Sequence, residues 1–198
     1  MKADPAAVDR VRERMRSFAP DAAHAEQVAF LAERLFDSLM RLHALAPADR
    51  DLLVSAGLLH DIGWSGGRRG HHRRSCETIR NDPDLPFEER DRTIVALVAR
   101  YHRRSLPDPA RHPVYGGLDE ADRARVRWLG GMVRLADGMD RDHEQVVSDL
   151  RCGLDATTIT VRCRVRRPVV ETVSESVTKA DLLEEVSGRR CRIVWERD

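Results

Sequence analysis

The sequence predicts a mainly α-helical bundle with a small α+β appendage at its carboxyl end. Up to about residue 148, apolar residues recur at steps of three and four, which is the period of an amphipathic helix. After residue 150, the segment TTITVRCRVRR alternates apolar and polar residues, as a strand with one buried face does. We therefore expect an all-helical domain over residues 1–148. A small subdomain of short antiparallel strands and one helix, residues 149–198, is expected to pack on it.

Proline, glycine and aspartate divide the helical part, because these residues are typical of helix starts and of the turns before them. The expected helices begin at Asp4–Pro5, at Asp21, at Pro47, near Gly70, near Pro86–Phe87, and at Asp119 or Asp122. Before the last of these, SLPDPARHPVYGG is a proline-rich loop that could cover a site. After the alternating strand, ETVSESVTKADLLEEV predicts a helix, and Gly188 leads into a final strand, RCRIVW.

Composition indicates a soluble globular protein, since 41% of the 198 residues are hydrophobic and 34% are charged. The net charge of +1 gives no general attraction to nucleic acid or to a membrane surface. We expect no signal peptide and no membrane span, and the four cysteines lack the C-x-x-C spacing, so a reduced, cytoplasmic protein is expected. The basic residues are arginine except for Lys2 and Lys179, which suits phosphate binding but also follows from a GC-rich genome.

Ionisable residues continue the apolar stripes of five helical segments, and this phase directs them toward the core. They are His24, His60, His72, His102 and Asp137. A buried carboxylate is costly unless a cation compensates it. A shared divalent ion would satisfy this set together with Asp61, because imidazole nitrogen and carboxylate oxygen bind Mn, Fe, Zn, Co or Mg. The alternative is a buried polar network without metal.

The other histidines are expected to lie outside this set. His43 is placed near a helix end, His112 in the proline-rich loop, and His143 in a charged segment. Each is predicted to be a surface or capping residue.

The order His24, His60-Asp61, Asp137 resembles that of the HD-domain metal-dependent phosphohydrolases. The closer resemblance is to the HD-like helical domain at the carboxyl end of the exopolyphosphatase/guanosine pentaphosphate phosphohydrolase (Ppx/GppA) family, and it covers roughly residues 15–198. It is carried by HAEQVAFLAERLFDSLMRLH, LLVSAGLLHDIG, GHHRRS, VALVARYHRRSLP and VRLADGMDRDH.

This resemblance implies a divalent metal held by His24, His60, Asp61 and Asp137, with one or two ions per site. It also implies that His72 and His102, with His71, hold a second metal or meet the phosphate of a substrate. Two positions depart from the family pattern: Trp64 stands where many HD enzymes have lysine, and Arg74 stands where relatives often have histidine. The larger relatives carry their phosphatase chemistry in an actin-like region with no counterpart in these residues, so exopolyphosphatase activity is not carried over.

The sequence leaves two functions open. The first is a phosphohydrolase for a phosphorylated small molecule or polyphosphate, in which Asp61 is catalytic and arginines contact the phosphate. The alternative for these arginines is a solvated surface that binds no phosphate. These phosphate-binding candidates are Arg73, Arg74, Arg103, Arg104 and the loop SGGRRG. The second is a binding or regulatory module for nucleotide or polyphosphate, with Arg162, Arg164 and Arg166 on one strand face. The alternative for this face is an exposed strand surface whose arginines pair with Glu171, Glu175, Glu184 and Glu185. A homodimer is left open.

Overall fold

The computed structural model describes residues 5–18, 21–169 and 179–197. Helices fill the chain up to Met139, and the strands follow. The helices are α1 (Pro5–Ser17), α2 (Ala22–His43), α3 (Pro47–Leu59), the short 3-10 helix η1 (Ile62–Gly66), α4 (His71–Asn81), α5 (Glu89–Tyr101), α6 (Pro113–Gly116), α7 (Glu120–Met139) and α9 (Asp181–Ser187). The strands are β1 (Val147–Leu154), β2 (Thr158–Val165) and β3 (Arg190–Arg197). The predicted class, mainly α with a small α+β appendage, is confirmed.

The helix starts follow the local signals in the sequence. The Asp21 carboxylate accepts a hydrogen bond from the backbone N–H of His24 at 3.1 Å and so caps α2. Asp119, rather than Asp122, caps α7 in the same way, at 2.8 Å. The helix expected near Pro86–Phe87 begins slightly later, at Glu89.

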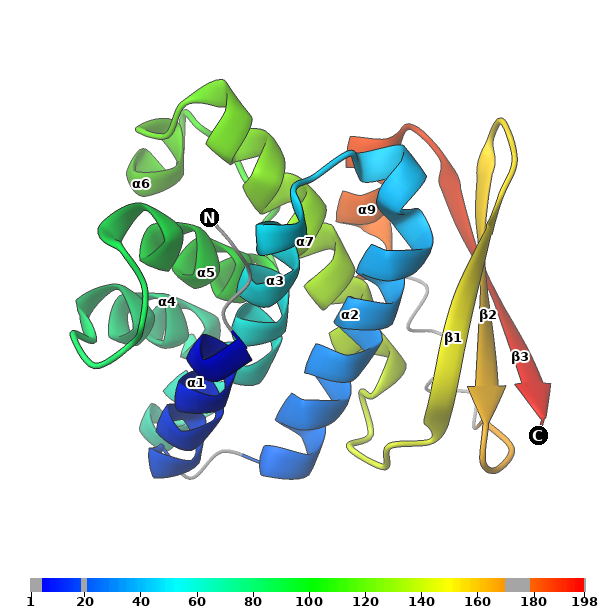
Figure 1. Cartoon of the computed structure of the whole chain (residues 1–198), viewed down its shortest axis with the longest axis horizontal. Helices are drawn as coiled ribbons and strands as arrows, with labels where there is room; N and C mark the ends of the chain where they lie inside the picture. The colour runs from blue at the N-terminus through cyan, green and yellow to red at the C-terminus, as the bar shows by residue number, and fades with distance from the viewer. Residues whose placement is uncertain (1–4, 19–20, 170–178, 198) are drawn as a thin grey trace.

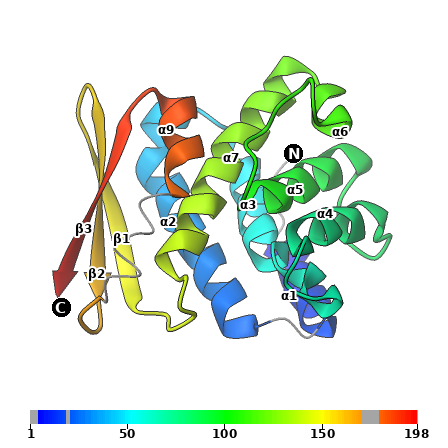
Figure 2. The same ribbon diagram turned by 180° about the vertical axis from the view of Figure 1, so that it is seen from behind.

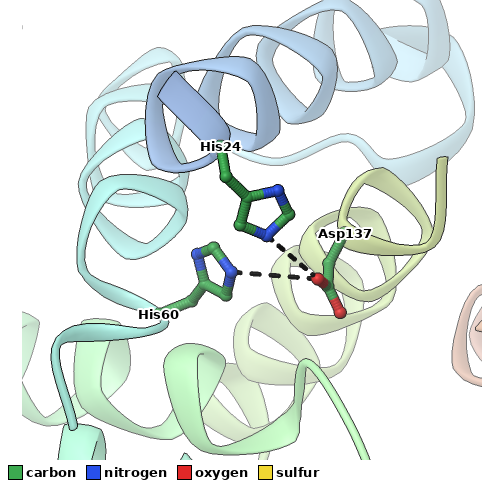
Figure 3. Close-up of side chains that lie close together, drawn as sticks. All are labelled: His24, His60 and Asp137. Atoms are coloured by element: carbon green, nitrogen blue, oxygen red, sulfur yellow. Dashed lines mark ion pairs between the residues drawn. The ribbon is translucent and has the colours of Figure 1, made fainter. Parts of the chain in front are cut away.

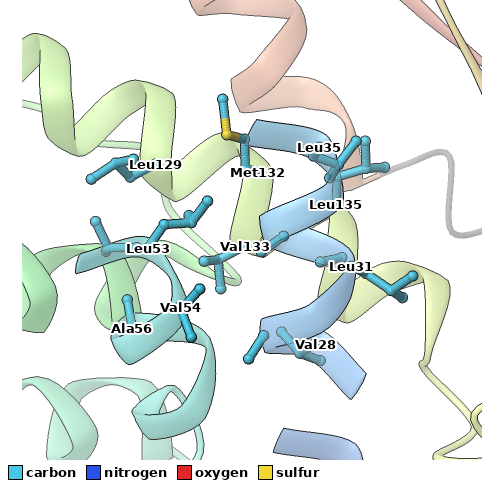
Figure 4. Close-up of a cluster of buried hydrophobic side chains, with 14 of the residues drawn as sticks. Val28, Leu31, Leu35, Leu53, Val54, Ala56, Leu129, Met132, Val133 and Leu135 are labelled. Atoms are coloured by element: carbon cyan, nitrogen blue, oxygen red, sulfur yellow. The ribbon is translucent and has the colours of Figure 1, made fainter. Parts of the chain in front are cut away.

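Helix α2 joins the helical part to the sheet (Figure 1). It contacts α3 and α7 on one side and β1 on the other. The reverse view shows α9 lying against α7, between the helices and the sheet (Figure 2). Inward-facing side chains of α2, α3 and α7 interlock in the middle, including Leu31, Leu53 and Val133 (Figure 4). The same core continues to the inner face of the sheet through residues such as Val161, so burial of apolar area stabilises both parts together.

The sheet has the order β1-β2-β3 and mixed strand directions. Strands β1 and β2 are antiparallel, but β2 and β3 are parallel, which corrects the expectation of antiparallel strands. Parallel neighbours require a crossover connection, and residues 166–189, which include α9, provide it. Part of the helix expected in this connection lies at residues 170–178, outside the described residues.

Strand β1 was not predicted from the sequence. A register shift between Val147 and Asp149 breaks the alternation of apolar and polar residues that marks a strand. Among the described residues, no helix combines the length and the apolar character that a membrane span requires.

Candidate functional site

Three buried side chains from different helices converge on one point (Figure 3). His24 lies in the first turn of α2, His60 directly follows α3, and Asp137 lies near the end of α7. Oδ1 of Asp137 is 3.4 Å from Nε2 of His24 and 3.9 Å from Nε2 of His60. The candidate ligand atoms of all three lie within 4.8 Å of one another, a spacing that a single ion can bridge.

A second triad lies beside the first. Oδ1 of Asp61 is 3.0 Å from Nε2 of His71 and 3.5 Å from Nε2 of His102. The other carboxylate oxygen of Asp61 is 3.6 Å from Nε2 of His60, so Asp61 stands between the two triads. The residues expected to share one metal are therefore divided between two adjacent groups, each with one carboxylate and two histidines.

Each of the four histidines is anchored through its Nδ1 atom. In each case Nδ1 lies 2.6–2.9 Å from an oxygen acceptor, so Nδ1 carries the proton and Nε2 faces the centre. The acceptors are Asp140 Oδ2 for His24, and the backbone carbonyls of Gly57 for His60, Arg68 for His71 and Ala99 for His102.

The buried Nε2 atoms of His24 and His60 have no hydrogen-bond partner within the described parts of the chain. Such buried polar atoms are costly unless something binds them. A set of anchored imidazoles and carboxylates whose free atoms face one centre fits a divalent ion.

The pKa shifts in the centre favour the protonation states that bind a metal for most of these groups, namely neutral imidazoles and ionised carboxylates. Burial lowers the pKa of His60, and it lowers the pKa of His102 to about 3, so both imidazoles are neutral near pH 7. Burial alone would raise the pKa of both carboxyls. For Asp61, the nearby imidazoles, first that of His60 and then that of His71, outweigh burial and hold the pKa below its ordinary value. For Asp137, the charge of Lys179 and the nearby imidazole of His24 hold the pKa well below its ordinary value.

His24 differs from its neighbours. Burial works to lower its pKa, but the nearby carboxylates of Asp137 and Asp140 outweigh burial and raise the pKa of His24 to about 9. Without a bound cation, this imidazole is therefore protonated at neutral pH.

A cavity of about 290 Å³ opens onto both triads. Basic side chains from several elements form much of its lining, which also includes the carboxylates of Asp61 and Asp137. The lining residues are Asp61, Trp64, Arg68, His71, His102, Arg103, Arg104, Arg134, Asp137, Arg141, His143 and Lys179. Guanidinium and ammonium groups around a candidate metal centre are suited to a phosphorylated ligand.

Comparison with known protein families shows to which family the chain is related. The family model described as Ppx/GppA phosphatase, domain III, matches residues 9–186. The chain belongs to this family. The match includes every residue of both triads and Lys179. No curated protein matches the chain.

In this member of the Ppx/GppA domain III family, only some of the arginines predicted to contact phosphate line the cavity. Arg103 and Arg104 line it, whereas Arg73 is exposed and is not among the lining residues. The guanidinium of Arg74 donates hydrogen bonds to the backbone carbonyls of Gly63 at 2.9 Å and Arg69 at 2.8 Å, and also to that of Gly67. Arg74 therefore braces the loop before α4 instead of facing the cavity.

The histidines also depart from the expected positions. His71, rather than His72, contacts Asp61, because the inward face of α4 runs through His71, Ser75 and Ile79. His72 is half-buried, and its ring centroid is 6.4 Å from that of His102. Burial, together with the charge of His71, lowers the pKa of His72 to about 4.

The three histidines expected outside the set have structural contacts. His43 lies at the end of α2, where its Nδ1 accepts a hydrogen bond from the backbone N–H of Leu45, but it is buried rather than on the surface, and Ala44 is the C-cap. His112 interacts with the hydroxyl of Tyr101 at 2.9 Å, so the proline-rich loop packs against α5. That loop contributes no residue to the described lining of the cavity.

Sequence reasoning missed three residues at the centre. Asp140 anchors His24, and the exposed His143 stacks on the His24 ring at 3.7 Å between centroids. Lys179 forms an ion pair with Oδ2 of Asp137. Lys179 is one of two lysines in an arginine-rich sequence, which was a usable signal, whereas Asp140 and His143 looked like part of a charged surface segment.

Proposed function

We propose that the protein is an HD-type metal-dependent phosphohydrolase that acts on a phosphoester or phosphoanhydride in a nucleotide or a polyphosphate-like substrate. The observation that carries the proposal is that the buried Nε2 atoms of His24 and His60 make no hydrogen bond and both face Oδ1 of Asp137, at 3.4 and 3.9 Å. These residues would hold one divalent ion, with Asp61 beside it. His71 and His102 would hold a second ion with Asp61.

The chain's own residues would orient the phosphoryl group and accept a proton. A divalent ion bound here lowers the pKa of a water molecule and neutralises phosphate oxygens. Arg103, Arg104 and Arg68 would orient the phosphoryl group from the cavity wall. The ionised carboxylate of Asp61 lines the cavity, so it is the candidate to accept a proton from the attacking water.

A metal and activity assay tests this proposal. Protein purified without chelator is analysed for metal, and phosphate release from nucleotides and inorganic polyphosphate is measured with Mn, Co, Mg and Zn. We expect His60→Gln and Asp61→Ala to lose both metal and turnover while circular dichroism remains helical. Asp84→Ala removes an exposed carboxylate outside the cavity and serves as the control. Unchanged metal content in both site variants would show that the metal centre is assigned wrongly.

A non-catalytic binding module for nucleotide or polyphosphate is the second candidate. Arg103 supports it, because this half-buried guanidinium forms no ion pair with a described residue. Burial and the neighbouring Arg104 lower the pKa of Arg103, so an anion at this position would relieve an electrostatic cost. Binding that weakens steeply with salt, without phosphate release under any condition above, would favour this function.

The strand arginines give weaker support to the module. Arg162 pairs with Glu196 at 3.0 Å, and Arg166 donates a hydrogen bond to the backbone carbonyl of Gln145. Among the glutamates expected as partners, Glu184 accepts from the backbone N–H of Cys191 and Glu185 pairs with Arg127. The partners expected at positions 171 and 175 lie outside the described residues.

A further inference from the structure

The carboxyl-terminal part of the chain delivers an ammonium group to the candidate metal centre. Lys179 stands two residues before α9, far from the triads in sequence. Its Nζ pairs with Oδ2 of Asp137, while Oδ1 of the same carboxylate faces His24 and His60. The Lys179 side chain is 25% exposed and also lines the cavity, so the ammonium can be reached by a ligand there.

The backbone next to Lys179 is fixed by a separate anchor. Arg134 of α7 binds the Asp181 carboxylate through two nitrogens, at 2.6 and 2.8 Å. The same guanidinium donates to the backbone carbonyls of Tyr101 at 3.3 Å and Arg104 at 3.1 Å. Lys179 therefore does not need its own ion pair to stay at the cavity, and its four-carbon side chain can change partner while the backbone remains in place.

The charges around Asp137 favour such a change. Lys179 and His24 pair with this buried carboxylate and compensate its charge. A divalent ion on Oδ1 would place a second positive charge close to the ammonium, and like charges repel strongly at such short range away from bulk water. A phosphate group bound beside the ion offers the ammonium a new anionic partner within the same cavity.

We propose that Lys179 pairs with Asp137 in the metal-free protein and binds a phosphoryl oxygen of the substrate once a divalent ion occupies the centre. This inference rests on the proposed function and assigns the carboxyl-terminal subdomain a direct part in substrate binding. Lys179 then has two measurable effects. Its ammonium competes with the metal for Asp137, and it strengthens the binding of phosphate to the metal-loaded protein.

The test measures two affinities on the full chain by titration calorimetry. The first is that of Mn²⁺ for the metal-free protein, and the second is that of inorganic phosphate for the Mn²⁺-loaded protein. Lys179→Gln keeps a hydrogen-bond donor near Asp137 without the charge, and Lys179→Met keeps only the aliphatic stem. For both variants we expect Mn²⁺ to bind about tenfold more tightly and phosphate about tenfold more weakly, the scale of one short charge-assisted contact. Arg192→Gln removes a charge on an exposed residue of β3 and should change neither affinity.

The alternatives give different results. If Lys179 only orients Asp137, Lys179→Gln will match the wild type and Lys179→Met will bind Mn²⁺ more weakly, which overturns the proposal. Tighter Mn²⁺ binding with unchanged phosphate binding overturns the substrate contact. If Mn²⁺ binds Lys179→Gln but not the wild type, the proposed function fails while the competition stands. If Mn²⁺ binds neither protein, both proposals fail.

Discussion

At the scale of single residues, the protonation of His24 separates it from the other histidines of the centre. Its pKa is raised to about 9, above the ordinary value of 6.5, so at pH 7 both ring nitrogens carry protons. The Nδ1 proton lies on the side of Asp140, and the Nε2 proton faces Asp137. A metal ion that binds Nε2 must displace the second proton.

We therefore predict that metal uptake at pH 7 releases about one proton per ion bound at the first triad. His60 adds none, because burial lowers its pKa and leaves it neutral. As the pH rises toward 9, His24 loses its proton unaided, so metal affinity should increase up to about that value and then level off. Calorimetry in two buffers of different ionisation enthalpy measures the proton count. No proton release at pH 7 would contradict His24 as a ligand in this state.

A second residue-scale prediction concerns Asp140. Its Oδ2 binds Nδ1 of His24 at 2.8 Å, and its Oδ1 accepts from the backbone N–H of Gln145 at 2.7 Å. An asparagine has one oxygen and cannot accept both bonds, so Asp140→Asn should lower metal affinity by about 10–100-fold, the usual effect of losing such a partner. Metal competition with a chromogenic chelator measures it. Asp142→Asn, at an exposed neighbour, is the control, and equal losses in both variants would refute the assignment.

Residue-level prediction from sequence worked where helical phase decides the position. The steps of four and eight residues correctly placed His24, His60, His102 and Asp137 in the interior. Phase could not show that Asp61 would stand between two triads, since that depends on the packing of α4 against α5. It also could not reveal Lys179, whose position depends on how α9 docks on α7.

At the scale of elements, the segment from η1 to α4 is held mainly by Arg74. Its guanidinium spans the carbonyls of this loop, and Gly63 donates its backbone N–H to the hydroxyl of Ser75 at 3.0 Å. We predict that Arg74→Gln costs about 1–2 kcal/mol in the free energy of unfolding, because the carbonyl of the buried Gly63 and two further carbonyls of the loop lose their donor. Arg73→Gln, at the exposed neighbour, should change it by less than about 0.5 kcal/mol. Urea unfolding measures both, and similar values would contradict the bracing role of Arg74.

The helices and strands also show which features a sequence pattern can predict. Helix boundaries were predictable because capping acts within a few residues, as Asp21 and Asp119 demonstrate. Strand direction was not, because the pairing of β2 with β3 is set by the long connection between them rather than by either strand's alternation. The interrupted alternation of β1 likewise hid a strand that its partner β2 makes evident.

At the scale of the whole molecule, the close approach of α7 and α9 connects the helical part to the carboxyl-terminal part. A Cβ atom at Gly131 would lie 3.0 Å from both the Cα and the backbone N of Leu183, so α9 can pack this closely only against a glycine. A Cβ atom at the adjacent Gly130 would meet the end of the Leu182 side chain at 3.3 Å and Cβ of Tyr101 at 3.8 Å, an ordinary van der Waals contact. The two glycines therefore differ in what a methyl group would displace.

We predict that Gly131→Ala lowers the free energy of unfolding by about 1–3 kcal/mol, because overpacking must push the α9 backbone outward. Gly130→Ala is the matched control on the same helix. It gains helix propensity of up to about 1 kcal/mol and displaces only a flexible side chain, so its stability should change little or increase. Because Lys179 stands close to α9, Gly131→Ala should also weaken phosphate binding by the metal-loaded protein, whereas Gly130→Ala should not. Urea unfolding and phosphate titration test both parts. Equal behaviour of the two variants would show that α9 is not held against α7 by this backbone contact.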